Sequence, residues 1–434
     1  MRKFDFKFFT NILLRSELLR SASILITGTV IAQLISILLQ PFLRRFFSPQ
    51  LYGIYSVYLS LIGIIIVISS LRYDDAIVLP KTDKESANIL GLSLIFSFSI
   101  NLILFLLVVA MGGNIIKFLN LPASFPVWLL YIIPLSAFLY NSYQCLNYWL
   151  VRKRKFYAVS ANKLSRRGAE GISQVSFALL KNTNGLIYSD IFGQTVNVLT
   201  VLFQTFKNGL TFRSISLVKL KYVFKKYKDF PKFNLLPAFM STCSFMLPPI
   251  FINKFFSSES AGFFDLAKLL LSVPLALVAT SFSSVLLQRV SERFNKRESF
   301  IAELKPVILI VSMISLIEIL AIVFFGEFLF KIIGGDSWII SGKISKIMVW
   351  SFTFNFIVST FTTIFVSMRR IKTYSLYQLF YFMAILSLLF FKSLGFVEFL
   401  KIYVLIEIIC YSILTTIIIF IIIRYEHSLK LINQ

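Results

Sequence analysis

The chain has 434 residues, of which 57% are hydrophobic and only 15% are charged. Globular domains average about 45–50% apolar and about 25% charged residues, so this composition excludes a disordered chain, a coiled coil and an ordinary soluble enzyme. Lysine and arginine number 44 against 20 acidic residues, which gives a formal charge of +24. In so apolar a chain, this charge indicates a bilayer protein with cations along its cytoplasmic edge rather than a nucleic-acid-binding protein.

The N-terminal segment, residues 1–20, is basic and amphipathic and leads directly into an apolar stretch. A cleaved signal peptide would instead end a short apolar run in small residues. We therefore expect this segment to form a cytoplasmic helix that lies on the membrane surface.

Twelve apolar stretches are long enough to be membrane-spanning helices, which need roughly 20 mostly apolar residues each. Eight of them carry no charged residue: 21–43, 46–71, 86–116, 118–151, 233–253, 269–288, 347–368 and 373–391. Four are interrupted by ionisable residues, at about 158–180, 185–206, 306–325 and 399–423. The sequence therefore predicts an all-α integral membrane protein.

An internal repeat divides these spans into two sets of six. Residues 45–55 read RFFSPQLYGIY and residues 254–264 read KFFSSESAGFF, and each copy joins the first and second span of its half. An even number of spans per half predicts two parallel lobes related by an axis along the membrane normal. The alternative is a chance match in a chain with 48 phenylalanines. We predict an N-terminal lobe at 21–206, a basic cytoplasmic linker at 207–232, a C-terminal lobe at 233–423 and a tail at 424–434.

The distribution of cations predicts the orientation. With both termini in the cytoplasm, 33 of the 44 lysines and arginines fall on the cytoplasmic side. The positive-inside rule strongly favours this topology. We therefore expect a multi-pass protein of the bacterial inner membrane with both termini inside.

Residues that carry out covalent chemistry are scarce. Cys145, Cys243 and Cys410 all lie in predicted spans at spacings that match no metal site or disulfide framework, and His427 lies in the tail. No glycine-rich phosphate loop or nucleophile elbow is present in the sequence. We expect no catalytic residue, no metal site and no cofactor.

A family resemblance rests on the first 90 residues and on the entry to the second half. The segments are LLRSASILITGTVI at 18–31, QPFLRRFFSPQLYGIYSVYLSL at 40–61, SLRYDDAIVLPKTDKES at 70–86, and residues 230–262 with their FPKF entry. This pattern resembles the polysaccharide transporter family, the O-antigen and capsule repeat-unit flippases (Wzx-type). That family belongs to the multidrug/oligosaccharidyl-lipid/polysaccharide (MOP) superfamily, which also contains the MATE transporters.

The resemblance implies two six-helix lobes around a central cationic cavity, and transport by alternating access rather than enzymatic catalysis. It also implies the cargo, an undecaprenyl-diphosphate-linked oligosaccharide moved from the cytoplasmic to the periplasmic leaflet during surface polysaccharide biosynthesis. The partners so implied are this lipid-linked oligosaccharide, membrane lipids and other polysaccharide assembly proteins, without nucleic acid. Whether a proton or sodium gradient is coupled to transport stays open.

Polar stripes on the predicted spans supply candidate substrate contacts, because a sugar diphosphate head cannot cross hydrocarbon unaided. Apart from Lys254, a cation at the outer end of a span, the candidates lie on the polar faces of their spans: Lys163, Arg166, Arg167, Gln174, Gln33, Asn141, Gln144, Gln194, Asn197 and Lys268. Two other interpretations are open. The span-five cations can lie at the cytoplasmic interface, and amide stripes often only bond neighbouring helices.

Two further groups of ionisable residues are candidates for other roles. Arg72, Asp74 and Asp75 follow the second span and form a candidate cytoplasmic gate or latch. Four carboxylates within spans are candidates for ion coupling: Asp190, Asp265, Glu318 and Glu407. Structural alternatives are ion pairs between Arg166 and Glu170 and between Asp265 and Lys268, or carboxyls kept protonated by burial.

Two rival functions fit a chain with many spans. A MATE-type drug/cation antiporter would have the same twelve spans, but the cations of span five argue against a cationic cargo. A polysaccharide polymerase or ligase resembles chains with a large periplasmic catalytic loop. The longest outer loop expected here, about 326–346, is short for such a loop.

Overall fold

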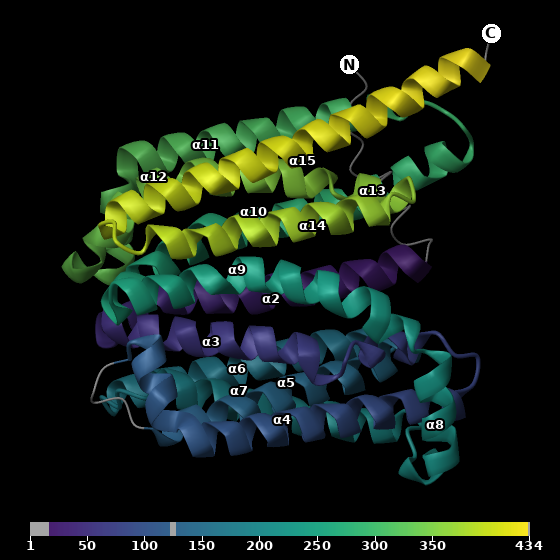
Figure 1. The fold of residues 1–434 in the computed structure, drawn as a ribbon, viewed down its shortest axis with the longest axis horizontal. Helices are drawn as coiled ribbons and strands as arrows, with labels where there is room; N and C mark the ends of the chain where they lie inside the picture. The colour runs from purple at the N-terminus through teal and green to yellow at the C-terminus, as the bar shows by residue number, and fades with distance from the viewer. Residues whose placement is uncertain (1–16, 122–126, 433–434) are drawn as a thin grey trace. The chain divides into compact units, whose positions relative to one another are not determined.

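The computed structural model describes residues 17–121 and 127–432, and these residues form helices and connecting turns without a β-strand (Figure 1). Residues 1–16, most of the predicted surface helix, lie outside the described residues. The all-α class expected from the sequence is confirmed.

The helices follow the predicted spans. In the first half of the chain they are α2 Glu17–Phe46, α3 Pro49–Ser69, α4 Asp83–Leu119, α5 Trp128–Arg152, α6 Phe156–Leu179 and α7 Gly185–Lys207. After a short linker helix, α8 Leu217–Lys226, the second half contains α9 Leu235–Phe255, α10 Ser258–Asn295, α11 Ile301–Gly334, α12 Ile339–Phe361, α13 Thr363–Ser367, α14 Ile371–Leu386 and α15 Phe396–Ile432. Each of the twelve predicted spans overlaps one of these helices. The span predicted at 118–151 corresponds to α5, which begins at Trp128.

Ten helices in the described part of the chain are long and apolar enough to cross a membrane. The two predicted spans that do not meet this measure are α5 and α6. Both are of spanning length, but α6 carries Lys163, Arg166, Arg167 and Glu170 within its 24 residues. Their polar content marks the region where the candidate site is to be sought.

The chain forms two compact units. Unit 1 comprises residues 1–43, 61–113 and 126–236, and unit 2 comprises residues 44–60, 114–125 and 237–434. The end of α2 and the first part of α3 thus group with the second half of the chain. The predicted lobe boundaries at 206 and 233 stay a prediction.

The core of unit 1 lies around the segment between α3 and α4. This segment is a 3-10 helix, Tyr73–Val78, which begins after Leu71 and Arg72 in left-handed backbone conformation with φ of 50° and 62°. The turn buries Tyr73 and Ile77 against Trp149 of α5 and neighbouring apolar side chains. Burial of this apolar surface offsets the cost of two successive non-glycine residues at positive φ.

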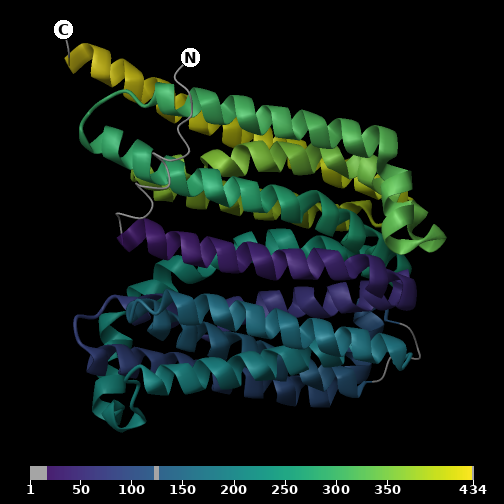
Figure 2. The same ribbon diagram turned by 180° about the vertical axis from the view of Figure 1, so that it is seen from behind.

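The linker helix α8 packs on unit 1. Its apolar positions Leu220 and Val223 are buried, and the hydroxyl of Tyr73 donates to the carbonyl of Phe224 at 3.0 Å. On the outer face, Lys226 forms an ion pair with Glu85 of α4 at 2.6 Å. Figure 2 shows α8 from behind, at one end of the unit 1 helices. The predicted basic linker therefore contains a helix that packs on unit 1.

In unit 2 the two copies of the sequence repeat meet. A Cβ atom on Gly53 of α3 would lie 2.6 Å from the carbonyl carbon of Ser258 on α10, and one on Gly262 would lie 2.6 Å from the carbonyl carbon of Pro49. Pro49 and Ser258 occupy equivalent repeat positions, as do the two glycines, so the contact is reciprocal. Only glycine allows two helix backbones to approach this closely.

Candidate functional site

The candidate site is built around α6, which packs along α7 in unit 1. Gly193 of α7 allows the approach, since a Cβ there would lie 2.9 Å from the Cβ of Glu170. On the opposite side, a Cβ on Gly28 of α2 would lie 2.6 Å from the Cβ of Ser160. These close approaches hold α6 between α2 and α7 and bring three predicted polar stripes together.

Arg166 lies in a polar cluster with side chains of α5 and α7. Its Nη2 atom lies 3.5 Å from Oδ1 of Asp190, and its guanidinium also donates to the hydroxyl of Tyr140. The Tyr140 hydroxyl donates to the same Asp190 oxygen at 2.9 Å. With its amide turned so that the oxygen faces the guanidinium, Gln194 accepts from Nε and Nη2 of Arg166, both at 2.6 Å. The fully buried Asp190 therefore shares this cluster with Arg166.

Glu170 balances the second arginine of the helix. Arg167 donates to Oε2 of Glu170 at 2.9 Å, while Nε of Arg166 lies 3.9 Å from the same oxygen. Gln174, one turn further along, donates to the other Glu170 oxygen at 3.4 Å. The ion pair between Arg166 and Glu170 that the sequence offered as a structural alternative is present. Arg167, however, lies closer to Glu170 than Arg166 does.

Lys163 differs from the two arginines because no carboxylate lies within ion-pair distance of it among the described residues. Its Nζ atom donates to the Thr29 hydroxyl of α2 at 2.7 Å, and the side chain is half-buried. One turn along α2, the buried Oε1 atom of Gln33 has no hydrogen-bond partner among the described residues. Lys163 is thus a cation whose charge is not balanced by a nearby acid.

The remaining amides of unit 1 are buried within the helix bundle. Asn141 and Asn197 are fully buried, and both retain side-chain atoms without a hydrogen-bond partner in the described part of the chain. Gln144 instead donates to Oδ2 of Asp74 at 2.9 Å. Buried polar groups of this kind are usually satisfied by water or by a ligand. Unit 1 therefore has an interior with spare hydrogen-bonding capacity.

The predicted latch residues form a network at one end of unit 1. Arg72 pairs with Asp75 at 2.8 Å, and Tyr148 of α5 donates to Asp75 at 3.1 Å. Asp74 is buried and accepts from Ser70 at 2.5 Å as well as from Gln144. Burial raises the pKa of the Asp74 carboxyl above its usual range. The network ties the turn after α3 to α5.

In unit 2, Asp265 pairs with a residue that the sequence pattern did not indicate. Arg44, at the end of α2, lies 2.6 Å from Asp265 and is stacked between the rings of Tyr52 and Trp338, at 3.4 and 4.4 Å from their centroids. Among the described residues Asp265 forms an ion pair with Arg44 and none with Lys268. A partner 221 residues away leaves no signal in local spacing.

The two unit 2 lysines proposed as substrate contacts lie over aromatic rings. Lys254 is 3.5 Å from the centroid of Phe118, and Lys268 is 3.4 Å from that of Phe245. Lys268 also donates to the carbonyl of Phe245 at 2.8 Å. These lysines belong to unit 2 and the α6 cluster to unit 1, so the substrate-contact candidates are distributed over both units.

The last two candidate carboxylates have contrasting surroundings. Glu407 of α15 is buried and accepts hydrogen bonds at Oε1 from Tyr403 at 2.7 Å, Tyr381 at 3.1 Å and Tyr411 at 3.3 Å. Glu318 of α11 has a buried oxygen with no hydrogen-bond partner among the described residues. The two carboxyls thus differ in hydrogen bonding, since three phenols donate to Glu407 and one Glu318 oxygen has no described partner.

Sequence reasoning missed two aromatic partners of these charges. Tyr140 precedes Asn141 on α5. Its ring faces the guanidinium of Arg166, whose Cζ lies 4.6 Å from the ring centroid. Trp338 donates from Nε1 to the carbonyl of Arg44 at 2.9 Å. Aromatic residues are so frequent in this chain that neither had a distinguishing signal. No group of three or more residues with metal-ligating side chains occurs in the described part of the chain.

Comparison with protein families places these features in context. A profile of a family described as polysaccharide biosynthesis protein matches residues 42–342, which is more than half of the chain. No curated protein sequence matches the chain.

Solved structures of MOP superfamily transporters share the fold. One is the inward-facing conformation of a multidrug resistance MATE family transporter, at 15% identity and TM-score 0.72, with 91% of this chain and 96% of that chain covered. Another is the lipid II flippase MurJ in an inward closed conformation, at 14% identity and TM-score 0.69, covering 94% and 91%. A third is a MOP superfamily transporter from Pyrococcus furiosus, at 15% identity and TM-score 0.58, covering 94% and 95%. The predicted MOP-like fold of a multi-pass membrane protein is confirmed.

Proposed function

The chain belongs to the polysaccharide biosynthesis protein family, and we propose that it is a flippase for undecaprenyl-diphosphate-linked oligosaccharides. The fold it shares with MOP superfamily transporters, among them a lipid II flippase, supports this proposal. The cargo moves from the cytoplasmic to the periplasmic leaflet of the inner membrane, and both termini lie in the cytoplasm.

The physics of the cargo explains why a carrier is needed and an enzyme is not. The polyprenyl tail stays in hydrocarbon, but the diphosphate and sugars must leave water, at a cost of several kcal/mol for each unpaired polar group. A protein lowers this barrier with cations and hydrogen-bonding groups inside its bundle. No bond of the cargo is made or broken.

Lys163 is the single observation that carries the proposal. It is a half-buried cation on a helix of spanning length, without a carboxylate partner among the described residues. A buried cation of this kind is costly unless an anion comes to it. In the proposed mechanism Lys163 is the first group to attract the diphosphate from the cytoplasmic leaflet.

Arg166 and Arg167 then take over the diphosphate by exchange of partners. In the empty protein Asp190 and Glu170 balance their charge, at 3.5 and 2.9 Å. A diphosphate offers more charge and more acceptor oxygens than either carboxylate, and arginine binds such groups in a bidentate manner. The empty site therefore stays close to neutral, and the loaded site releases its carboxylates.

The sugars follow along polar groups that lack partners in the protein. Gln33 on α2 and Asn197 on α7 each retain a buried acceptor atom with no described partner. Sugar hydroxyls donate to such acceptors as the oligosaccharide passes. These amide groups are neutral and can accept a hydrogen bond from any hydroxyl, so they suit a cargo with many hydroxyls. Movement of two lobes completes the transfer in this proposal.

Ion coupling follows from the same exchange. When the diphosphate displaces Asp190 from Arg166, the buried carboxylate loses its cation, which makes Asp190 the candidate for ion coupling. Cargo binding and proton uptake are then linked at one residue. In this proposal a D190N variant transports without dependence on a pH gradient.

The central test compares K163Q with K155Q in purified protein reconstituted into vesicles that contain the lipid-linked oligosaccharide. Lys155 is an exposed cation at the start of the same helix, so K155Q is a matched control. We expect K163Q to slow flipping at least tenfold, by loss of the unbalanced charge, and K155Q to retain the wild-type rate. Equal rates for both variants, at equal membrane insertion, would remove the observation on which the proposal rests.

Deletion of the gene separates this function from its rivals. Loss of a flippase leaves completed single repeat units on the cytoplasmic leaflet. Loss of a polymerase instead leaves a one-unit glycan on the cell surface. Unaltered glycan together with raised drug sensitivity would support the antiporter.

A further inference from the structure

A cavity of about 740 Å³ opens at one end of unit 2. Its walls come from the end of α10, the turn between α13 and α14, and the last four turns of α15. Its apolar lining is Phe294, Met368, Ile417, Phe420 and Ile421. The volume lies within the roughly 300–1,000 Å³ typical of small-molecule sites.

The polar side chains of this cavity fall into two kinds. Three hydroxyls donate hydrogen bonds to backbone carbonyls: Thr416 to Ser412 at 2.9 Å, Ser428 to Tyr425 at 2.6 Å, and Tyr425 to Glu298 at 3.1 Å. Arg370 and Arg424 also line the cavity, and within the described part of the chain neither has a carboxylate at ion-pair distance. The cavity therefore combines apolar walls with two unbalanced guanidinium groups.

Three other cations near this end of unit 2 are paired with acids. Arg289 pairs with Glu303 at 2.7 Å, Arg293 with Glu298 at 2.5 Å, and Lys296 with Glu292 at 2.7 Å. The acid closest in sequence to Arg424 is Glu426, which accepts instead from Ser299 at 2.9 Å. Arg370 and Arg424 differ from these three cations, because they line the cavity and have no acid at ion-pair distance among the described residues.

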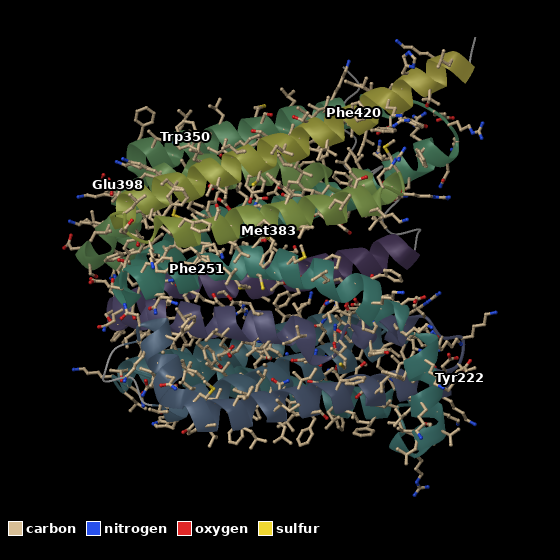
Figure 3. The ribbon with its side chains drawn as sticks, in the orientation of Figure 1. Tyr222, Phe251, Trp350, Met383, Glu398 and Phe420 are labelled. Carbon is tan, nitrogen blue, oxygen red and sulfur yellow. The ribbon has the colours of Figure 1, made fainter. Side chains whose placement is uncertain are left out.

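The lining matches one class of molecule, an amphiphile with an anionic phosphate and an apolar chain. Guanidinium groups bind phosphate through paired N–H donors. Phe420, labelled on α15 in Figure 3, is 63% exposed and extends the apolar wall outward. Because both arginines lie where the sequence predicts the cytoplasmic end of the spans, the phosphate would sit at headgroup level in the inner leaflet.

We propose that this cavity binds an anionic phospholipid of the inner leaflet, with its phosphate on Arg370 and Arg424 and an acyl chain along Ile417, Phe420 and Ile421. The site is formed by unit 2 residues alone, whereas the α6 cluster belongs to unit 1, and it does not depend on the transported cargo. A lipid bound there anchors α14 and α15 to the bilayer surface and covers apolar side chains that the unit leaves open.

The test measures binding of phosphatidylglycerol to the purified full chain by native mass spectrometry, with phosphatidylcholine as the neutral comparison. R370Q/R424Q removes the two cavity cations. R369Q/K372Q removes two exposed cations of the same turn that do not line the cavity, so it is matched in charge. R370K/R424K keeps both charges and guards against a folding defect.

We expect R370Q/R424Q to bind phosphatidylglycerol roughly 30-fold more weakly than wild type, because each cation near an anionic lipid contributes about fivefold in affinity. R369Q/K372Q should bind as wild type does, and R370K/R424K should retain most of the affinity. Unchanged binding by R370Q/R424Q would overturn the proposal, as would equal binding of phosphatidylcholine. Displacement of the lipid by millimolar inorganic phosphate, or by polyprenyl phosphate at far lower concentration, would also overturn it by assigning the site to another ligand.

Discussion

Alanine at Gly53 places a methyl group inside the reciprocal crossing of α3 and α10. The added Cβ would lie 2.6 Å from the carbonyl carbon of Ser258 and 2.9 Å from the backbone nitrogen of Gly262. Non-bonded carbon atoms pack at roughly 3.5–4.0 Å, and the carbonyl oxygen of Ser258 lies closer to the added Cβ than its carbon does, so the two backbones must separate by more than about 1 Å. Backbone atoms cannot rotate away as a flexible side chain does.

The expected cost of G53A is about 3 kcal/mol, at the upper end of the range for overpacked cores. In a unit of this size that cost corresponds to a fall of roughly 6–12 °C in the unfolding midpoint. Thermal unfolding in detergent, followed by size-exclusion chromatography of the surviving monodisperse protein, measures it. G262A should cost a similar amount, because its Cβ meets the carbonyl carbon of Pro49 at the same 2.6 Å.

The control is G113A on α4, where an added Cβ has no neighbour within 4 Å. There alanine should be neutral or stabilise by about 0.5–1 kcal/mol through its higher helix propensity. The double variant G53A/G262A should cost less than the sum of the single variants, since one separation relieves both clashes. If G53A and G113A have the same midpoint, the close crossing is not present in the folded protein.

Three further predictions concern charged groups. Burial raises the pKa of Asp74, so the folded chain retains a proton that the unfolded chain loses, and stability falls as the pH rises above about 4. In D74N the unfolding midpoint should decrease less between pH 4 and pH 8 than in the wild type. The same decrease in both proteins would contradict the raised pKa of Asp74. R44M should cost about 3 kcal/mol, because Asp265 loses its partner, and R44M/D265N should recover part of that loss in the same assay. If Glu407 carries a coupled proton, E407Q should abolish the pH-gradient dependence of transport in vesicles, and a persisting dependence would exclude that role.

Local spacing was sufficient to predict the helices and the polar face of α6. Stretches of about 20 apolar residues form helices in a bilayer because every backbone group must bond within its own segment. Arg167 and Glu170 are three residues apart, so their contact follows from helix geometry alone. The repeat, too, was visible in the sequence, and its two glycines proved to be the residues that touch.

The pairing of charges was decided by tertiary structure. Arg44 and Asp265 are 221 residues apart, and Arg166 meets Asp190 across two helices. No periodicity within one helix records which neighbour a side chain will face, because that depends on how helices pack. The composition thus determined the class, the spans and the orientation expected for them. Only the packed structure distinguished the balanced Arg166 from the unbalanced Lys163, since the difference lies in whether a distant carboxylate comes within about 4 Å.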